Sequence, residues 1–294
     1  MPGKYTTLLA VALLILPVSF TSLNDHKHQM TPEKGSIGML EEYLASLYDH
    51  LQGSAGLPGY DAFSRAVTGY FNLKASGKIN NELLTIIDFS LSSNGKRMWI
   101  IHMPEMKIVH TCLVSHGRNS GEEFARHFSN IPSSHKSSLG FYVTGDIYYG
   151  RHGKSLYLDG VEHGINDNAR FRTIVMHSAD YVSNEYIRRY GRLGRSFGCP
   201  AIPVEGHQRI IRMLSGQSCL YIHYPDKEYI SRSELFEPAI AMNEMSYFAE
   251  KLHESFLEQT LLFKRLPFYR LAPGGVSRSE DISRRSLSYT SFLK

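Results

Sequence analysis

The sequence predicts a mainly β domain with flanking helices, folded as a compact β-sandwich or a barrel-like sheet. Three observations support this fold class: short apolar runs recur between residues 83 and 224, turn residues separate them, and apolar residues at helical spacing lie on both sides. Short strands separated by Gly, Asn, Ser and Pro are typical of sandwiches and barrels. With 294 residues, 42% of them hydrophobic, the chain is long enough to bury a sizeable core.

Residues 1–22 have the composition of a secretory signal peptide. Lys4 and the amino terminus provide positive charge, and Leu8–Phe20 forms an apolar run of 13 residues. A membrane-spanning helix needs about 20 apolar residues. We therefore expect cleavage near Thr21 or Ser22 and an exported protein of the periplasm or cell envelope, with no stable membrane span after cleavage. The alternative is an uncleaved N-terminal anchor, because the site lacks a clear Ala-x-Ala pattern.

Residues 23–36 are expected to be a linker, and residues 37–80 a helical segment packed on the core. Within that segment, apolar side chains follow helical spacing in Ile37–Leu51 and again in Tyr60–Ser76. Each stretch therefore predicts a helix with one face against the rest of the protein.

The main domain is expected over residues 81–230. It contains one helical stretch, Glu205–Ser215, and a series of strand-like runs bounded by turn residues. These runs cover residues 83–91, 97–103, 107–114, 140–145, 155–158, 171–177 and 218–224.

Residues 231–263 are expected to be a C-terminal helical segment, followed by a basic tail over residues 264–294. The tail has seven Lys or Arg residues against two acidic residues, whereas the rest of the chain has 25 against 26. A basic chain end of this kind is typically disordered, and the alternative is contact with an anionic envelope polymer. The near-neutral body and the export signal argue against a nucleic-acid partner.

Three cysteines, an odd number, leave at least one thiol free or paired between chains in an exported protein. Cys112 and Cys219 lie in strand-like runs, where cysteines usually behave as small buried hydrophobic residues. We expect these two to be buried or to pair with each other. Cys199 differs because it lies in a turn-like segment rich in Gly, Ser and Pro.

Cys199 follows His177 by 22 residues, and His177 ends a predicted strand. A free cysteine has a pKa of about 8.5, so a nearby histidine is needed to take its proton and stabilise the thiolate. Gly198 allows a tight turn, through which the amides of Gly198 and Cys199 can point at a developing oxyanion. Residue types alone therefore indicate a candidate catalytic pair, although one Cys and one His occur together in many exported chains.

The segment S-F-G-C-P-A (196–201), with H-S-A (177–179) upstream, resembles the signature of the L,D-transpeptidase catalytic-domain family, in the branch with S-x-G-C-P-A. The similarity extends from about residue 38 to residue 225 and implies an L,D-transpeptidase fold, in an exported bacterial enzyme that remodels peptidoglycan. Further matching segments are H-G-R-N-S-G (116–121), F-S-N (128–130), S-S-L-G-F-Y (137–142), G-x-x-G-x-S-L-Y-L-D-G-V-E (150–162) and N-D-N-A-R (166–170).

The resemblance implies that Cys199 is the nucleophile of a murein L,D-transpeptidase, that His177 holds its proton, and that the Ser178 carbonyl orients the imidazole. The bond attacked joins an L-centre to the terminal D-amino acid of a stem tetrapeptide. An acceptor amine then gives a 3→3 cross-link, or water gives the product of an L,D-carboxypeptidase. The implied partners are peptidoglycan stem peptides and carbapenem-type covalent inhibitors, with no cofactor and no metal.

Five residues in or beside the matching segments are expected to bind substrate: Ser196, Arg195, Arg172, Asn166 and Gly140. For Ser196, the equal alternative is a turn-forming hydroxyl group. The commoner family pattern is S-H-G-C with a polar residue two positions after the cysteine. Here Phe197 replaces the histidine and Ala201 replaces the polar residue, so Arg195, Arg172 or Arg170 is expected to supply the missing contact with the donor.

Two other functions remain open. The first is a zinc peptidase that uses His152 and Asp159, at the spacing H-x6-D, with His163 downstream. The expected Glu-x-x-His is absent, because Glu162 is directly beside His163. The second is a non-catalytic peptidoglycan-binding module on the same fold, which the replacements at residues 197 and 201 keep open.

Overall fold

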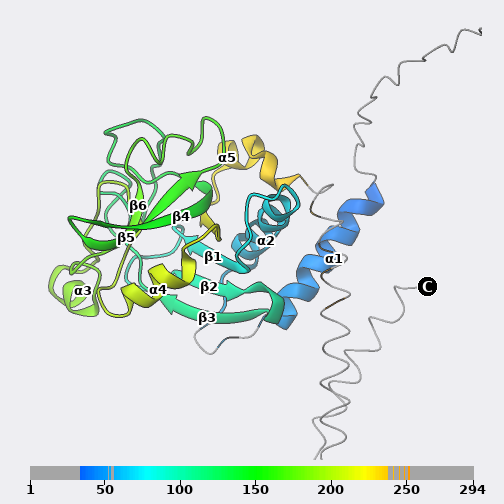
Figure 1. Cartoon of the computed structure of the whole chain (residues 1–294), viewed down its shortest axis with the longest axis horizontal. Helices are drawn as coiled ribbons and strands as arrows, with labels where there is room; N and C mark the ends of the chain where they lie inside the picture. The colour runs from blue at the N-terminus through cyan, green and yellow to red at the C-terminus, as the bar shows by residue number, and fades with distance from the viewer. Residues whose placement is uncertain are drawn as a thin grey trace, which may run out of the picture. The chain divides into compact units, whose positions relative to one another are not determined.

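The protein contains one sheet of eight strands flanked by helices (Figure 1). The structure is a computed structural model and describes residues 34–51, 53, 56–237, 241, 245, 248 and 251. The helices are α1 (Lys34–His50), α2 (Tyr60–Ala75), α3 (Asn184–Tyr190), α4 (His207–Leu214) and α5 (Lys227–Arg232). The strands are β1 (Leu83–Asp88), β2 (Met98–His102), β3 (Lys107–Cys112), β4 (Gly140–Gly150), β5 (Gly153–Gly160), β6 (Val175–Ser178), β7 (Ala201–Ile202) and β8 (Cys219–His223).

The strand order is β3-β2-β1-β8-β4-β5-β6-β7. β1 pairs with β8 and β6 pairs with β7 in parallel, and the other neighbours are antiparallel. Ser115, just after β3, forms an antiparallel bridge with Ala201 of β7, and the Ser115 amide donates to the Ala201 carbonyl at 2.9 Å. This bridge joins the two ends of the strand order, so the sheet is a nearly closed barrel. The predicted fold class is confirmed.

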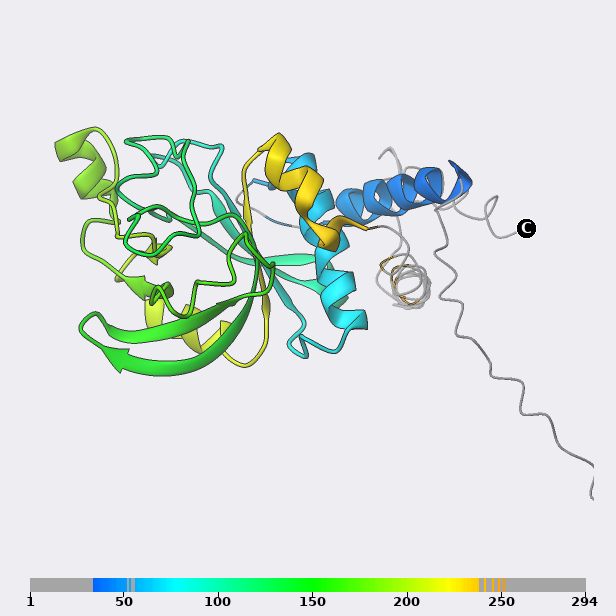
Figure 2. The same ribbon diagram turned by 90° about the horizontal axis from the view of Figure 1, so that it is seen from above.

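Helix α2 packs against β1 and β8, and α1 packs against α2 (Figures 1 and 2). The predicted apolar face of the first helix is confirmed, because Leu40, Leu44 and Leu47 are buried. On α2, a Cβ at Gly69 would lie 2.1 Å from the Phe141 ring. The absence of a side chain at Gly69 lets α2 pack closely against the start of β4.

Several element boundaries differ from the expectations. The strand predicted over 171–177 begins only at Val175, because Phe171 is exposed and Thr173 has a φ of 54°. Helices α3 and α5 and the two-residue strand β7 were not predicted. Helix α3 buries none of its seven residues, so it has no apolar periodicity, and its N-terminus is capped by the Ser183 side chain, which accepts from the Tyr186 amide.

The ends of the chain are described only in part. Helix α1 begins at Lys34, so the last residues of the expected linker are helical, and the rest of the linker lies outside the described residues. In the C-terminal segment, residues 241, 245, 248 and 251 are helical, and the Phe248 ring lies 5.3 Å from that of Phe71. The predicted signal peptide (1–22) and basic tail (264–294) lie outside the described residues. No helix in the described part of the chain is long and apolar enough to cross a membrane.

Cys112 and Cys219 are buried free thiols, so the alternative of a disulfide between them is wrong. They lie on β3 and β8, which are separated in the sheet by β2 and β1. Neighbouring strands are about 4.8 Å apart, whereas a disulfide needs Cα atoms within about 7 Å. Both residues are small buried side chains of the core.

Candidate active site

Strands β6 and β7 bring the two predicted catalytic residues into one region of the barrel. In the parallel pairing, His177 lies opposite Ala201 and Ser178 opposite Ile202. Cys199 precedes β7 by two residues, so it enters the sheet directly beside the strand that carries His177. The Cys199 side chain is half-buried, and its Sγ lies 3.6 Å from the Thr173 carbonyl, just before β6.

His177 is held as a neutral imidazole of defined tautomer. Its side chain is 3% exposed, and its Nδ1 lies 2.9 Å from the Ser178 carbonyl. A carbonyl oxygen only accepts, so Nδ1 carries the hydrogen and Nε2 keeps a lone pair. Burial lowers the pKa of His177; the bond to Ser178 opposes that effect, and the charges of His152 and Arg151 add to it. The neutral form, which can accept a proton, is therefore favoured.

Cys199 is a protonated thiol in the resting site. Burial raises its pKa, and this effect outweighs hydrogen bonding from the Val175 amide, the charge of Arg172, and its own amide. The last three favour the thiolate once a base takes the proton. The resting pair is therefore a neutral thiol and a neutral imidazole. The two backbone amides and the Arg172 guanidinium are already in place to stabilise the thiolate when it forms.

The side chain of Ser196 closes the turn that precedes the cysteine. Its Oγ donates to the Cys199 carbonyl at 2.6 Å and accepts from the Gly198 amide at 3.0 Å. This geometry fits the alternative given for Ser196, a hydroxyl group that forms the turn. The Gly198 amide is already bonded, so its expected place in an oxyanion site is not supported by this geometry. Of the two amides predicted for that site, the one of Cys199 remains.

Gly198 is required for steric reasons. Its φ is 125°, and a Cβ at this position would lie 2.8 Å from the Lys136 carbonyl oxygen and 2.9 Å from Ile174 Cδ1. Its own carbonyl accepts from Ser137 Oγ at 3.0 Å. Loop 134–138 therefore packs directly against the backbone of the cysteine motif, and any larger residue at 198 would separate them.

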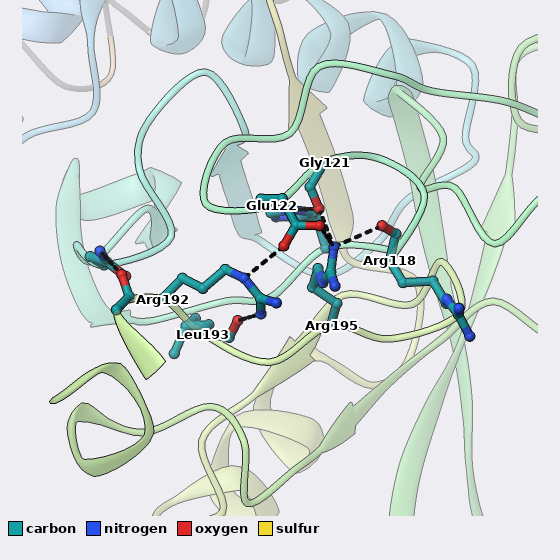
Figure 3. A network of polar contacts seen from close by, with 9 residues as sticks. Arg118, Gly121, Glu122, Arg192, Leu193 and Arg195 are labelled. Atoms are coloured by element: carbon teal, nitrogen blue, oxygen red, sulfur yellow. Dashed lines mark hydrogen bonds and ion pairs between the residues drawn. The ribbon is translucent and has the colours of Figure 1, made fainter. Parts of the chain in front are cut away.

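The three arginines expected to contact the donor are all engaged within the protein. Arg195 Nη1 donates to the carbonyls of Arg118 and Gly121 and to Glu122, with which Arg192 also pairs (Figure 3). Arg172 donates to groups of loop 129–138, and Arg170 forms a bidentate pair with Asp159. The Arg172 acceptors are Ser129 O, Ser134 Oγ, Lys136 O and Ser138 Oγ. The Arg170 acceptors are Asp159 Oδ1 and Oδ2.

These contacts change the interpretation of the arginines. Arg195 joins the loop at residues 118–122 to the cysteine motif, and Arg172 holds loop 129–138 beside Cys199. A donor carboxylate could use either one only in competition with existing partners. Ala201, the position of the missing polar residue, is completely buried in a small apolar cluster with Leu113, Ala179, Val182 and Leu193.

Asn166 and Gly140 lie in the interior, away from any surface that a substrate can reach. Asn166 is 0% exposed, and its amide nitrogen donates to the carbonyls of Leu139 and Phe141. A Cβ at Gly140 would lie 2.2 Å from Glu162 Oε2. We therefore correct their expected substrate-binding role: both residues shape the start of β4.

Glu162 is a buried carboxyl group in the same cluster. It accepts from the Phe141 amide at 2.6 Å, from the Tyr229 hydroxyl at 3.2 Å, and from the Ser233 hydroxyl. Burial raises its pKa, and these three bonds oppose the shift. The cluster joins α5 to the beginning of β4 without reaching the cysteine.

Arg97 and His116 form a buried pair that hydrogen-bonds to the backbone of the cysteine motif. Neither residue was predicted to be part of the site. Arg97 is 0% exposed and donates to His116 Nδ1 at 2.8 Å, and the His116 carbonyl accepts from the Ser196 amide at 3.0 Å. Burial and the charge of Arg97 lower the pKa of His116 to about 3. His116 lies in the H-G-R-N-S-G segment, which signals a site in the sequence but not this buried role.

Phe197 is 57% exposed beside the cysteine and has polar neighbours from two loops. The His135 ring lies 4.5 Å from its ring, and the Arg118 guanidinium lies 5.7 Å from it. The residue that replaces the commoner histidine thus forms an aromatic surface next to Cys199 rather than part of the core.

The residues of the zinc alternative have separate partners. The His152 ring stacks on His177, Asp159 pairs with Arg170, and His163 Nδ1 lies 2.8 Å from Asp167. Within the described ranges, no group of three or more His, Cys, Asp or Glu side chains could hold a metal ion. The structure does not bring the proposed ligands together.

Comparison with protein families agrees with the fold and with these motifs. The model of the L,D-transpeptidase catalytic domain matches residues 57–223, which is more than half of the chain. The chain belongs to the L,D-transpeptidase catalytic-domain family. The family implies a peptidoglycan substrate and a place in the cell envelope. A search of curated proteins finds no match, and assignment to the S-x-G-C-P-A branch stays a prediction.

Proposed function

We propose that the protein is a cysteine-dependent murein L,D-transpeptidase whose nucleophile is Cys199 and whose proton acceptor is His177. One observation carries this proposal: the Nδ1–H of His177 is committed to the Ser178 carbonyl, which leaves Nε2 as the basic nitrogen on the strand next to Cys199. A nucleophile, its base and a group that orients the base are the parts needed for acyl transfer.

The proposed reaction begins when Nε2 of His177 takes the thiol proton and Sγ of Cys199 attacks the carbonyl of the L-centre. The Cys199 amide stabilises the oxyanion, and the Arg172 charge favours the thiolate. The imidazolium then gives its proton to the amine of the leaving D-amino acid, and a thioester remains. In the second step, the acceptor amine attacks the thioester and its proton passes to His177; the S–acyl bond breaks, and His177 gives the proton to the departing Cys199 thiolate.

The acceptor decides the outcome of the second step. An amine of another stem peptide gives a 3→3 cross-link, and water gives the L,D-carboxypeptidase product. Both follow the same thioester, so both fit the present site. A substrate of the wall also fits the predicted signal peptide and export to the periplasm or cell envelope.

The test is acyl-enzyme formation by residues 23–294 with a carbapenem or a disaccharide-tetrapeptide. The acyl-enzyme is detected by intact-mass spectrometry. Cys199→Ala should form no adduct, because no atom remains to carry the acyl group. His177→Ala should acylate about 10²–10⁴-fold more slowly and should recover in part at high pH, where hydroxide generates the thiolate. The double variant should be no worse than Cys199→Ala alone, because the pair acts as a unit.

Three outcomes would overturn the proposal. If a well-folded Cys199→Ala variant still processes the tetrapeptide, the covalent mechanism is wrong. If EDTA abolishes the activity and zinc restores it, whereas thiol alkylation has no effect, a zinc peptidase replaces the cysteine enzyme. A parent protein that binds peptidoglycan but never acylates would indicate the non-catalytic module.

A further inference from the structure

The turn of the β4–β5 hairpin carries a second histidine onto the proposed base. The rings of His152 and His177 have centroids 4.3 Å apart and planes 22° apart, a stacked arrangement. His152 is exposed, whereas His177 is 3% exposed beneath it. The surface histidine therefore covers one face of the buried one.

The hairpin geometry accounts for this contact. Gly150 pairs with Gly153, so Arg151 and His152 are the two residues of the turn, and Gly153 has a φ of 74°. Strand β5 then pairs antiparallel with β6, the strand of His177. Figure 2 shows the long β4–β5 hairpin extending away from α1 and α2. Backbone pairing along β5 and β6 thus fixes where the turn lies relative to the base.

Once χ1 is set, a single torsion, about the Cβ–Cγ bond, decides the plane of the His177 imidazole. The torsion about the Cβ–Cγ bond of histidine is broad, so it is weakly fixed by the side chain itself. The hydrogen bond from Nδ1 to Ser178 fixes the direction of one ring atom. The His152 ring stacked on the face restrains the same torsion further, because rotation of the imidazole would bring the two rings into collision.

We propose that His152 is a positioning residue for His177, because its stacked ring holds the imidazole plane that leaves Nε2 available to the Cys199 thiol. This inference rests on the proposed function for its effect on rate, but the contact itself does not. It also gives a role to a histidine that the sequence placed among candidate zinc ligands.

The charges around His177 predict a second effect. His152 and Arg151 face it from the β4–β5 turn, and Cys199 lies two residues before β7, the strand that pairs with that of His177. Further charged or titratable groups around Cys199 are Arg172 after the 166–170 segment, Tyr148 on β4, and Tyr181 after β6. A positive charge on either turn residue opposes a second one on His177. Removal of His152 or Arg151 should therefore raise the pKa of His177.

Three variants separate stacking from charge. His152→Phe keeps an aromatic ring without a charge, His152→Ala removes both, and Arg151→Gln removes a neighbouring charge but leaves the stack. His207→Ala is the matched control, because His207 caps its own turn at the Val204 carbonyl, outside the proposed site. For each variant we would measure the pH profile of carbapenem acylation and the pH titration of the His177 Cε1–H resonance by NMR.

We expect His152→Ala to acylate about 10- to 100-fold more slowly, the scale of a small misplacement of a reacting group. His152→Phe should acylate close to the parent rate, and its His177 resonance should titrate at higher pH. Arg151→Gln should show the same direction of shift, and His207→Ala should match the parent in both measurements.

The inference is overturned if His152→Ala acylates at the parent rate, or if His177 titrates at the same pH in every variant. It is also overturned if His152→Phe is as slow as His152→Ala, because an aromatic ring stacked on His177 would then not be sufficient to maintain the rate. Should the parent protein fail to acylate at all, the proposed function falls, and the NMR titrations alone decide whether His152 acts on His177.

Discussion

Replacement of Ser196 by alanine tests whether the hydroxyl group of the cysteine motif builds the turn or takes part in the reaction. The side chain is 6% exposed, and its Oγ bridges the Gly198 amide and the Cys199 carbonyl. The Ser196→Ala variant leaves one donor and one acceptor without their partner. Each unpaired buried polar group costs about 1–3 kcal/mol, so loss of the partner of both should lower the free energy of unfolding by about 2–6 kcal/mol.

The assay is chemical and thermal unfolding of the parent, Ser196→Ala and Ser196→Thr, each followed by carbapenem acylation. A loss of this size lowers the Tm by roughly 4–24 °C for a domain of 150–250 residues. Ser196→Thr keeps the hydroxyl group and should regain most of the stability and of the acylation rate. Ser183→Ala is a matched serine control: it removes the cap of α3, costs about 1 kcal/mol, and should not slow acylation.

One result would refute this reasoning. If Ser196→Ala unfolds at the parent free energy yet acylates at least about 100-fold more slowly, the hydroxyl group acts on the reaction, as an oxyanion-site donor does. If stability and acylation fall together and threonine restores both, the hydroxyl group is a structural part of the turn.

Two further predictions concern the remaining buried groups. Mild iodoacetamide treatment and peptide mapping should find Cys199 modified first, because burial raises the pKa of Cys112 to about 12 and raises that of Cys219 further; faster labelling of either would contradict this. Glu162→Gln should flatten the pH dependence of Tm. Burial raises the pKa of Glu162 in the fold, so its contribution to stability is fully present below the unfolded value of about 4.3 and is lost as pH rises through the folded value. Gln removes the charge and keeps one acceptor oxygen for Phe141 and Tyr229, while its amide nitrogen can donate to the Ser233 hydroxyl. An unchanged Tm–pH curve would count against the argument.

Local patterns in the sequence were sufficient for the larger elements. Helices α1 and α2 and most of the strands follow from apolar spacing, because their buried faces repeat with the period of the element. The short elements were missed for the same reason: α3 buries no residue, and β7 has only two. The start of β6 was placed too early, because the apolar Phe171 is exposed before the strand begins. Sequence pattern reports burial, so it fails where an element buries little.

The sequence by itself determined the family, the candidate pair of Cys199 and His177, and the expectation that two other cysteines are core residues. It could not determine what each polar group near the pair would bind. The Gly198 amide bonds to Ser196, Arg195 pairs with Glu122, and His152 stacks on His177 only because distant segments meet around the barrel. Hydrogen bonds and ring contacts depend on positions within a few ångströms, which long-range strand pairing sets and residue spacing along the chain does not.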